Sequence, residues 1–219
     1  MTTSRTTYRH GDLARALLDA GVELAREGGP GAVVLREATR RVGVSPNAAY
    51  RHFTDHQTLL REVCAVAMGQ LAVAMETRQA VVPAVLRGPD RARARLRAVG
   101  AGYLDYARRE PRLFRTAFAV ADQLDQLSET RERGAVGAGA TGLTPFQLLS
   151  EALDGLVAAG LLPPTGRPDA EMLAWSSVHG LAMLLIDGPL RGLDRTHADK
   201  LGDQLLDYIE AGLLHPADQ

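Results

Sequence analysis

Residues 34–60, VLREATRRVGVSPNAAYRHFTDHQTLL, decide the fold of this chain. Leu35, Ala38 and Val42 recur at helical spacing, which predicts a short amphipathic helix. Gly43 follows, and its permissive backbone is typical of the position just after a helix. The stretch therefore begins with a short helix that ends in a tight turn.

A second short helix is expected directly after this turn. Ser45 is typical of an N-cap and Pro46 of a first helical residue, so the helix is predicted from Pro46 to about His52. Thr54 and Gln57 then have the spacing of a capping box, which predicts the start of a third, longer helix.

Two short helices joined by a tight turn that contains glycine form a helix-turn-helix, whose second helix can lie in the major groove of DNA. A helical corner inside an ordinary bundle is the alternative. The outer face of the second helix carries side chains suited to phosphates and base edges: Asn47, Ala48, Tyr50, Arg51 and His52.

These residues also carry a family resemblance. Residues 43–60 resemble the recognition segment of TetR-type (TetR/AcrR) transcriptional repressors, and residues 8–29 resemble the first helix of that family. Trp175, His179 and Gly180 resemble the signature of one C-terminal domain class, the Trp-His-Gly class.

The resemblance implies a DNA-binding site and one departure from the family pattern. The residues expected to contact double-stranded operator DNA are Leu35, Arg36, Ser45, Pro46, Asn47, Ala48, Tyr50, Arg51, His52 and His56. His56 stands where the family usually has a lysine that contacts a phosphate. Either this contact depends on pH here, or the positive N-terminus of the third helix provides it.

Composition agrees with a local DNA surface. The 219 residues are 46% hydrophobic, enough for a sizeable core, and the net charge of −1 excludes a uniformly basic coat. One cysteine excludes an intrachain disulfide and fits a reducing cytoplasm. Residues 172–186, the longest apolar run, are too short to span a membrane, so no membrane partner is expected.

The helix start and stop signals along the chain predict an all-α protein with two domains. Residues 1–56 form a three-helix DNA-binding domain, a helix from 55 to about 79 links it to the body, and 57–219 form a larger helical ligand-binding and dimerisation domain. Besides a first helix over 11–27, later helices are expected over about 90–109, 111–126, 144–159, 169–187 and 195–214. The arginines early in 90–109 favour a solvated face over a second DNA site.

Several apparent chemical motifs have simpler interpretations. Residues 137–142 spell G-x-G-x-x-G, but they follow SETRERGA where a dinucleotide fingerprint needs a hydrophobic strand, so no cofactor is expected. His52 and His56 have the spacing of paired metal ligands, but residues between them break the helix and no carboxylate completes a metal site. Cys64 lies among apolar residues and is expected to be a buried thiol. No catalytic constellation is recognised.

The aromatic residues of the body have two interpretations. They either fill the core or line a pocket for a small apolar or amphipathic effector, as the family resemblance implies. For the pocket, the candidate residues are Tyr103, Tyr106, Phe114, Phe118, Phe146, Leu149, Trp175 and His179. His179, one turn after Trp175, is either the polar contact to the effector or a satisfied core histidine.

The last two helices are more apolar than one packing face requires, which predicts half of a four-helix dimer interface. The predicted homodimer interface comprises Met183, Ile186, Leu201, Leu205, Tyr208 and Ile209. The sequence thus indicates a dimeric, ligand-responsive, cytoplasmic transcriptional repressor. A helical small-molecule-binding module without DNA function and a helical enzyme are the alternatives.

Overall fold

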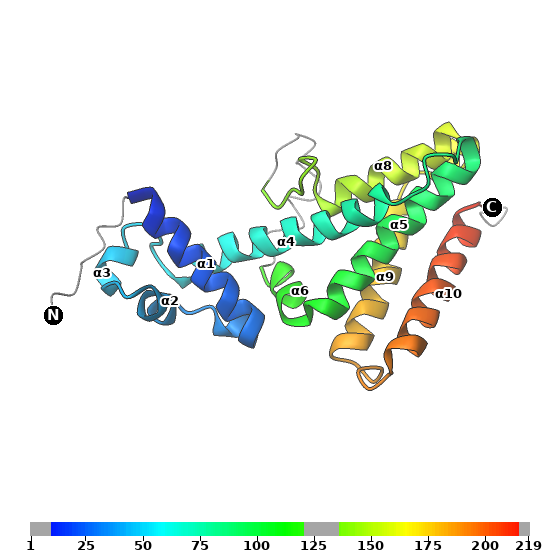
Figure 1. The fold of residues 1–219 in the computed structure, drawn as a ribbon. Coiled ribbons are helices and arrows are strands. Elements are labelled where there is room, and N and C mark those ends of the chain that lie inside the picture. The colour runs from blue at the N-terminus through cyan, green and yellow to red at the C-terminus, as the bar shows by residue number, and fades with distance from the viewer. Residues whose placement is uncertain (1–9, 121–135, 215–219) are drawn as a thin grey trace. The chain divides into compact units, whose positions relative to one another are not determined.

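The computed structural model describes residues 10–120 and 136–214, and these residues contain helices but no β-strand (Figure 1). The helices are α1 (His10–Gly28), α2 (Leu35–Val42), α3 (Pro46–Ala49), α4 (His56–Ala80), α5 (Gly88–Arg109), α6 (Pro111–Ala117), α8 (Pro145–Ala158), α9 (Ala170–Ile186) and α10 (Arg195–Leu214), with short 3-10 turns at Pro30–Ala32 and Pro164–Gly166. The all-α prediction is confirmed.

The described residues form two compact units, named here the head and the body. The head comprises residues 10–67 and 112–120, and the body comprises residues 68–111 and 136–214. Helix α4 begins in the head and ends in the body. The head therefore extends eleven residues past the expected boundary at residue 56 and also includes most of α6.

The head is built around helices α1, α2 and α3, which pack against one another. Their apolar faces meet in a core in which each of the following is at most 6% exposed: Leu17, Ala38, Ala49, Phe53 and Leu59. The apolar spacing in α2 thus produces the predicted buried face, and the opposite face is left at the surface.

In the body, α5 packs against α8, α9 and α10. Two glycines of α5 permit close approach of neighbouring helices. A Cβ on Gly102 would lie 2.6 Å from the Cα of Met75 in α4, and a Cβ on Gly100 would meet the Leu206 side chain of α10. The arginines early in α5 lie at the surface, where Arg93 pairs with Glu210 at 3.1 Å and Arg97 pairs with acidic residues of α10.

Two helices end earlier than the sequence predicts. Helix α3 ends at Ala49 instead of about His52, and its backbone continues as a turn in which the amide of His52 donates to the carbonyl of Ala49. Helix α6 ends at Ala117, although the prediction extended to about residue 126. The amide of Phe118 donates to the residue three positions earlier, which tightens and ends the helix; residues 121–126 lie outside the described part.

The capping predictions have mixed outcomes. The capping box of Thr144 and Gln147 is confirmed, with both hydrogen bonds present at the start of α8. The box proposed at Thr54 is wrong, because α4 begins one residue later and the carboxylate of Asp55 accepts from the Thr58 amide at 2.8 Å. Ser45 occupies the N-cap position of α3, but its side chain makes no capping hydrogen bond.

Helix α4 is long and apolar enough, by length and composition alone, to cross a membrane. The sequence inspection missed this because it considered only the uninterrupted apolar run in α9. In the most apolar 18-residue window of α4, 56% is buried within the protein, as in the core helix of a globular domain. Its apolar residues therefore have a packing role in both units.

Candidate nucleic-acid interface

The turn between α2 and α3 has the geometry that the sequence predicts. Gly43 adopts a left-handed conformation with φ 74°, and the amides of Gly43 and Val44 both donate to the carbonyl of Thr39 at 2.9 and 3.0 Å. These bonds satisfy the Thr39 carbonyl in the last turn of α2 and redirect the chain toward α3. The two helices pack against each other, and Ala38 of α2 and Ala49 of α3 are both fully buried.

The outward side of α3 and of the turn after it is polar and exposed. Ser45, Pro46, Asn47 and Arg51 are exposed, and Tyr50, a large aromatic residue, is 55% exposed. An aromatic side chain exposed to this degree adds little to the core, and its ring and hydroxyl remain available to a partner. Asn47 of α3 and Tyr50 and Arg51 of the following turn thus expose amide, phenol and guanidinium groups.

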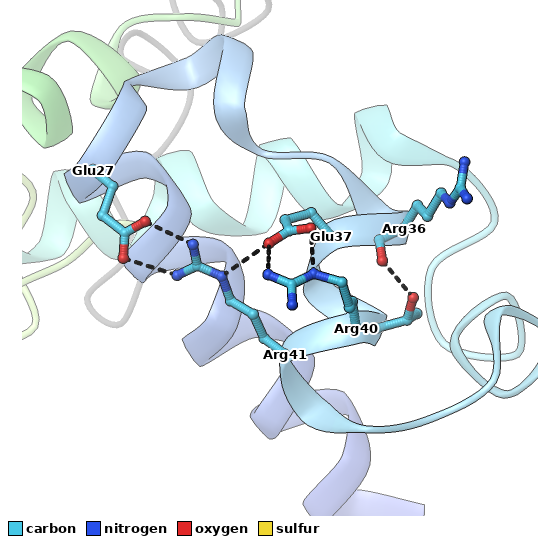
Figure 2. A network of polar contacts seen from close by, with 6 residues as sticks. Glu27, Arg36, Glu37, Arg40 and Arg41 are labelled. Atoms are coloured by element: carbon cyan, nitrogen blue, oxygen red, sulfur yellow. Dashed lines mark hydrogen bonds and ion pairs between the residues drawn. The ribbon is translucent and has the colours of Figure 1, made fainter.

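Arginines in and next to the helix-turn-helix fall into two classes (Figure 2). Arg41 forms a bidentate pair with Glu27 of α1 at 2.9 and 2.6 Å, and Arg40 forms one with Glu37 at 2.9 and 2.6 Å. In contrast, the Arg36 guanidinium points away from these carboxylates, and its carbonyl accepts from the buried Thr39 hydroxyl at 2.7 Å.

Arg36 and Arg51 form no ion pair within residues 10–120 and 136–214, and both are exposed. Free guanidinium groups on a surface of this kind suit phosphates or guanine, to which they can donate bidentate hydrogen bonds. Arg40 and Arg41 are instead neutralised by neighbouring carboxylates. The unpaired positive charge of this surface therefore lies at Arg51, in the turn after α3, and at Arg36, at the start of α2.

The acidic partners of the paired arginines are held ionised. Hydrogen bonds from Arg40, followed by the nearby charges, lower the pKa of Glu37 to about 2. Hydrogen bonding from Arg41 likewise lowers the pKa of Glu27. At neutral pH both pairs therefore remain charged and keep Arg40 and Arg41 oriented toward the protein.

The remaining predicted contacts differ in their availability. Leu35 is only 5% exposed, so its side chain belongs to the core and any contribution would come from its backbone amide in the first turn of α2. Ala48 and His52 are half-buried, whereas His56 is exposed at the first residue of α4. The Asp55 carboxylate caps this helix next to His56. Its negative charge reduces the attraction of the helix N-terminus for a phosphate.

Three of the predicted effector-site residues form a hydrogen-bonded chain in the body. The indole Nε1 of Trp175 donates to the Tyr103 hydroxyl at 3.1 Å, and that hydroxyl lies 2.7 Å from Nδ1 of His179. Burial raises the pKa of Tyr103 above its usual value and lowers the pKa of His179. Burial therefore favours the neutral forms of both the phenol and the imidazole.

The other predicted pocket residues are distributed over different places. Phe114 and Phe118 belong to the head, where their rings meet edge to face with centroids 5.2 Å apart. In the body, Phe146 is half-buried and Leu149 is buried. Tyr106 lines an open groove of about 1090 Å³ formed by parts of α4, α5, α9, the turn before α10 and the start of α10.

The glycine-rich segment binds a carboxylate of the protein itself. The amides of Ala140 and Thr141 donate to Glu76 of α4 at 2.8 and 2.9 Å, and the Thr141 hydroxyl donates to it at 2.6 Å. These amides are consequently engaged with α4.

Cys64 and the histidine pair offer no further site in the described part of the chain. Cys64 is buried as predicted, and desolvation raises its pKa to about 11, so it is a thiol at neutral pH. Among residues 10–120 and 136–214, no three His, Cys, Asp or Glu side chains are arranged to hold a metal ion.

Sequence inspection missed the difference between paired and unpaired arginines. The spacing of Glu37 with Arg40 and Arg41 is a helical ion-pair pattern that could have shown part of it. The bond between Glu27 and Arg41 spans fourteen residues and depends on how α1 packs against α2. It could not be read from local spacing.

Comparison with known families covers both ends of the chain. Residues 17–63 match the family model described as bacterial regulatory proteins of the tetR family, and residues 96–209 match the tetracyclin repressor-like C-terminal domain. No protein with a curated description matches the chain. The Trp-His-Gly class stays a prediction.

Solved structures share the fold. A protein of unknown function from a Rhodococcus species is 24% identical, with a TM-score of 0.71, and the match covers 96% of this chain and 100% of that one. The TetR family transcriptional regulator PfmR from Thermus thermophilus is 20% identical, with a TM-score of 0.56 and coverage of 90% and 98%. A TetR-family transcriptional regulator from Pectobacterium atrosepticum is 19% identical, with a TM-score of 0.58 and coverage of 98% and 100%.

The C-terminal domain model alone spans more than half of the chain, and the N-terminal model covers the helix-turn-helix described above. The family assignment makes the protein a transcription factor and not an enzyme. The chain belongs to the TetR family of DNA-binding transcriptional regulators.

Proposed function

We propose that the protein is a homodimeric repressor that binds a palindromic operator and leaves it when a small molecule binds the body. The observation that carries the DNA-binding part is the exposure of Asn47 in α3 and of Tyr50 and Arg51 in the turn after it, while Arg40 and Arg41 are ion-paired. Asn47 and Arg51 are proposed to contact base edges, and Tyr50 and Arg36 to contact the DNA backbone.

Homodimerisation is supported by exposed apolar residues on α9 and α10. Leu173 on α9 is 65% exposed and Tyr208 on α10 is 76% exposed, and Leu184 is also exposed. Of the predicted interface residues, Met183, Ile186, Leu201, Leu205 and Ile209 are half-buried within the protomer.

Gly180 lies between Leu173 and Leu184 on the exposed side of α9, and a Cβ on it would meet no atom within 4 Å. Packing within the protomer therefore does not require glycine at this position. A glycine here favours close approach of a helix from a second subunit. Twofold pairing through α9 and α10 would present two copies of α3, which requires a palindromic operator.

The effector would act by favouring one of two body conformations. A ligand shifts such an equilibrium only as far as its affinities for the two states differ, and by linkage the operator opposes its binding equally. The chain of Trp175, Tyr103 and His179 joins α9 to α5 within the body and could be rearranged by a ligand. The proposed place of action is the cytoplasm, together with the DNA.

Selection of DNA from a random-sequence pool tests the proposed function without knowledge of the operator. The wild-type protein should enrich an inverted repeat, whose two halves lie about one helical turn apart. Asn47→Ala and Tyr50→Ala should lose binding to the enriched sequence by at least about tenfold while retaining helicity and dimer content. Enrichment of no motif, or of a single half-site only, would contradict the proposed dimeric operator complex.

A further inference from the structure

The groove in the body combines apolar walls with an excess of arginines. Its apolar side chains come from three segments: Val73 and Ala74 on α4, Leu185 and Ile186 on α9, and Leu190 and Leu193 before α10. Val73 and Leu193 are exposed, although both are large apolar residues. Five arginines and two carboxylates also line the groove: Arg78, Arg108, Arg109, Arg191, Arg195, Asp105 and Glu110.

Carboxylates satisfy only part of this positive charge. Asp105 accepts from Arg78 at 2.6 Å and from Arg108 at 3.0 Å, and Asp199 lies 2.5 Å from Arg108 and 3.8 Å from Arg195. The Nε of Arg108 is nevertheless buried without a hydrogen-bond acceptor in the described part of the body. The arginines that line the groove therefore have more hydrogen-bond donors than the neighbouring carboxylates accept from.

Arg109 and Arg191 have no carboxylate partner in the described part of the chain. Arg109 lies at the end of α5 and Arg191 in the turn between α9 and α10; both are exposed, and neither forms an ion pair within residues 10–120 and 136–214. Two unpaired guanidinium groups beside exposed apolar side chains fit a molecule with an anionic group at one end and an apolar part at the other.

We propose that this groove binds an amphipathic anion, in which an apolar body carries a carboxylate, sulfonate or phosphate group. Arg109 and Arg191 would bind the anionic group, and the apolar part would cover Val73, Leu190 and Leu193. This inference names the chemical class of the effector, and its use in regulation rests on the proposed function. It places the effector in a groove that shares only Tyr106 with the aromatic set predicted from the sequence.

Two fluorescent probes with one ring skeleton separate the contributions of charge and apolar contact. Anilinonaphthalene sulfonate carries an anionic group, and phenylnaphthylamine has the same rings without it. The full-length protein, titrated without DNA, should bind the sulfonate probe at one site per subunit and more tightly than the neutral probe. Added salt should weaken the sulfonate complex more than the neutral one, because only the former includes an ionic contact.

Arg109→Gln and Arg191→Gln should each weaken sulfonate binding by about fivefold, and together by about twentyfold, with little change for the neutral probe. Arg95→Gln is the matched control, since Arg95 also lies on α5 but does not line the groove. Circular dichroism and melting curves should show that all variants remain folded.

Equal affinity for the two probes would overturn the proposal, as would equal sulfonate binding by the double variant and the Arg95→Gln control. DNA binding is measured separately on the same proteins. Failure of the wild-type protein to select an operator would contradict the proposed repressor and leave the probe result standing.

Discussion

The hydroxyl of Tyr103 on α5 lies 2.7 Å from Nδ1 of His179 on α9, and the same hydroxyl accepts a hydrogen bond from Trp175. The Tyr103 oxygen therefore links two side chains of α9 to α5. Burial lowers the pKa of His179, so the folded protein favours the neutral imidazole. The stability of the body is therefore sensitive to acid.

The first prediction follows from the sign of that shift. Because the folded protein disfavours the charged imidazole, the contribution of His179 to stability is fully present above the unfolded pKa, about 6.5, and decreases as the pH falls below it. The free energy of unfolding, measured in urea, should therefore decrease from pH 7.5 to 5.5. His179→Asn keeps an acceptor but cannot titrate, so its decrease should be smaller. An equal decrease in both proteins would exclude His179 as the cause.

Cys64 provides a second prediction. Its thiol is buried in the head and its pKa is raised to about 11, so the thiolate is scarce at pH 8. The reaction can be followed with a disulfide reagent whose released product absorbs light. This reagent should modify Cys64 in the native protein at least about a hundredfold more slowly than in the protein unfolded in urea. Rapid modification of the native protein would show that α4 opens readily at this position.

Two glycines that differ in their surroundings provide a matched stability test. Gly102→Ala would force a Cβ to within 2.6 Å of the α4 backbone, so it should lower the free energy of unfolding by about 1–3 kcal/mol or more. Gly155→Ala places a Cβ in open space on helix α8 and should raise stability by about 0.5–1 kcal/mol. Similar effects of both changes would contradict the close α4–α5 packing.

The fourth prediction concerns assembly. Tyr208→Glu and Leu173→Glu change exposed residues, so the protomer should remain folded, while a carboxylate at the proposed interface should weaken the dimer by at least about a hundredfold. Val85→Glu is the control, since Val85 is more exposed still and lies outside α9 and α10. Sedimentation equilibrium should give a monomer for the first two and a dimer for the third. An intact dimer for Tyr208→Glu and Leu173→Glu would move the interface elsewhere.

Much of the fold could be predicted because its signals are local. Apolar spacing, Gly43 and the residues around Pro46 lie close together in the sequence and act through one or two turns of backbone. The cap of α4 shows the limit of this approach. Thr54 and Asp55 are both residue types that commonly cap helices. Only the hydrogen bond from the Thr58 amide shows that Asp55 is the cap.

The pairing of the arginines and the groove in the body depend on tertiary packing and were not predicted. Arg40, Arg51 and Arg109 look alike in the sequence, but their availability is decided by neighbouring carboxylates. The groove in the body is formed by segments more than a hundred residues apart, so no local pattern could indicate it. Aromatic composition instead suggested Phe114 and Phe118, which belong to the head.

The most direct measurement of the central claim, that the unpaired arginines of the helix-turn-helix bind DNA, compares three single substitutions on the selected operator. Arg51→Gln and Arg36→Gln each remove an exposed, unpaired cation, whereas Arg40→Gln removes one that is bound to Glu37. Fluorescence anisotropy over a range of salt concentrations gives both the affinity and its salt dependence.

Arg51→Gln should weaken binding by at least about tenfold, and Arg36→Gln should reduce the slope of log affinity against log salt by about one. Arg40→Gln should bind like the wild-type protein, with an unchanged slope. If Arg40→Gln loses as much affinity as Arg51→Gln, or if neither Arg51→Gln nor Arg36→Gln differs from the wild type, the assigned DNA-binding face is wrong.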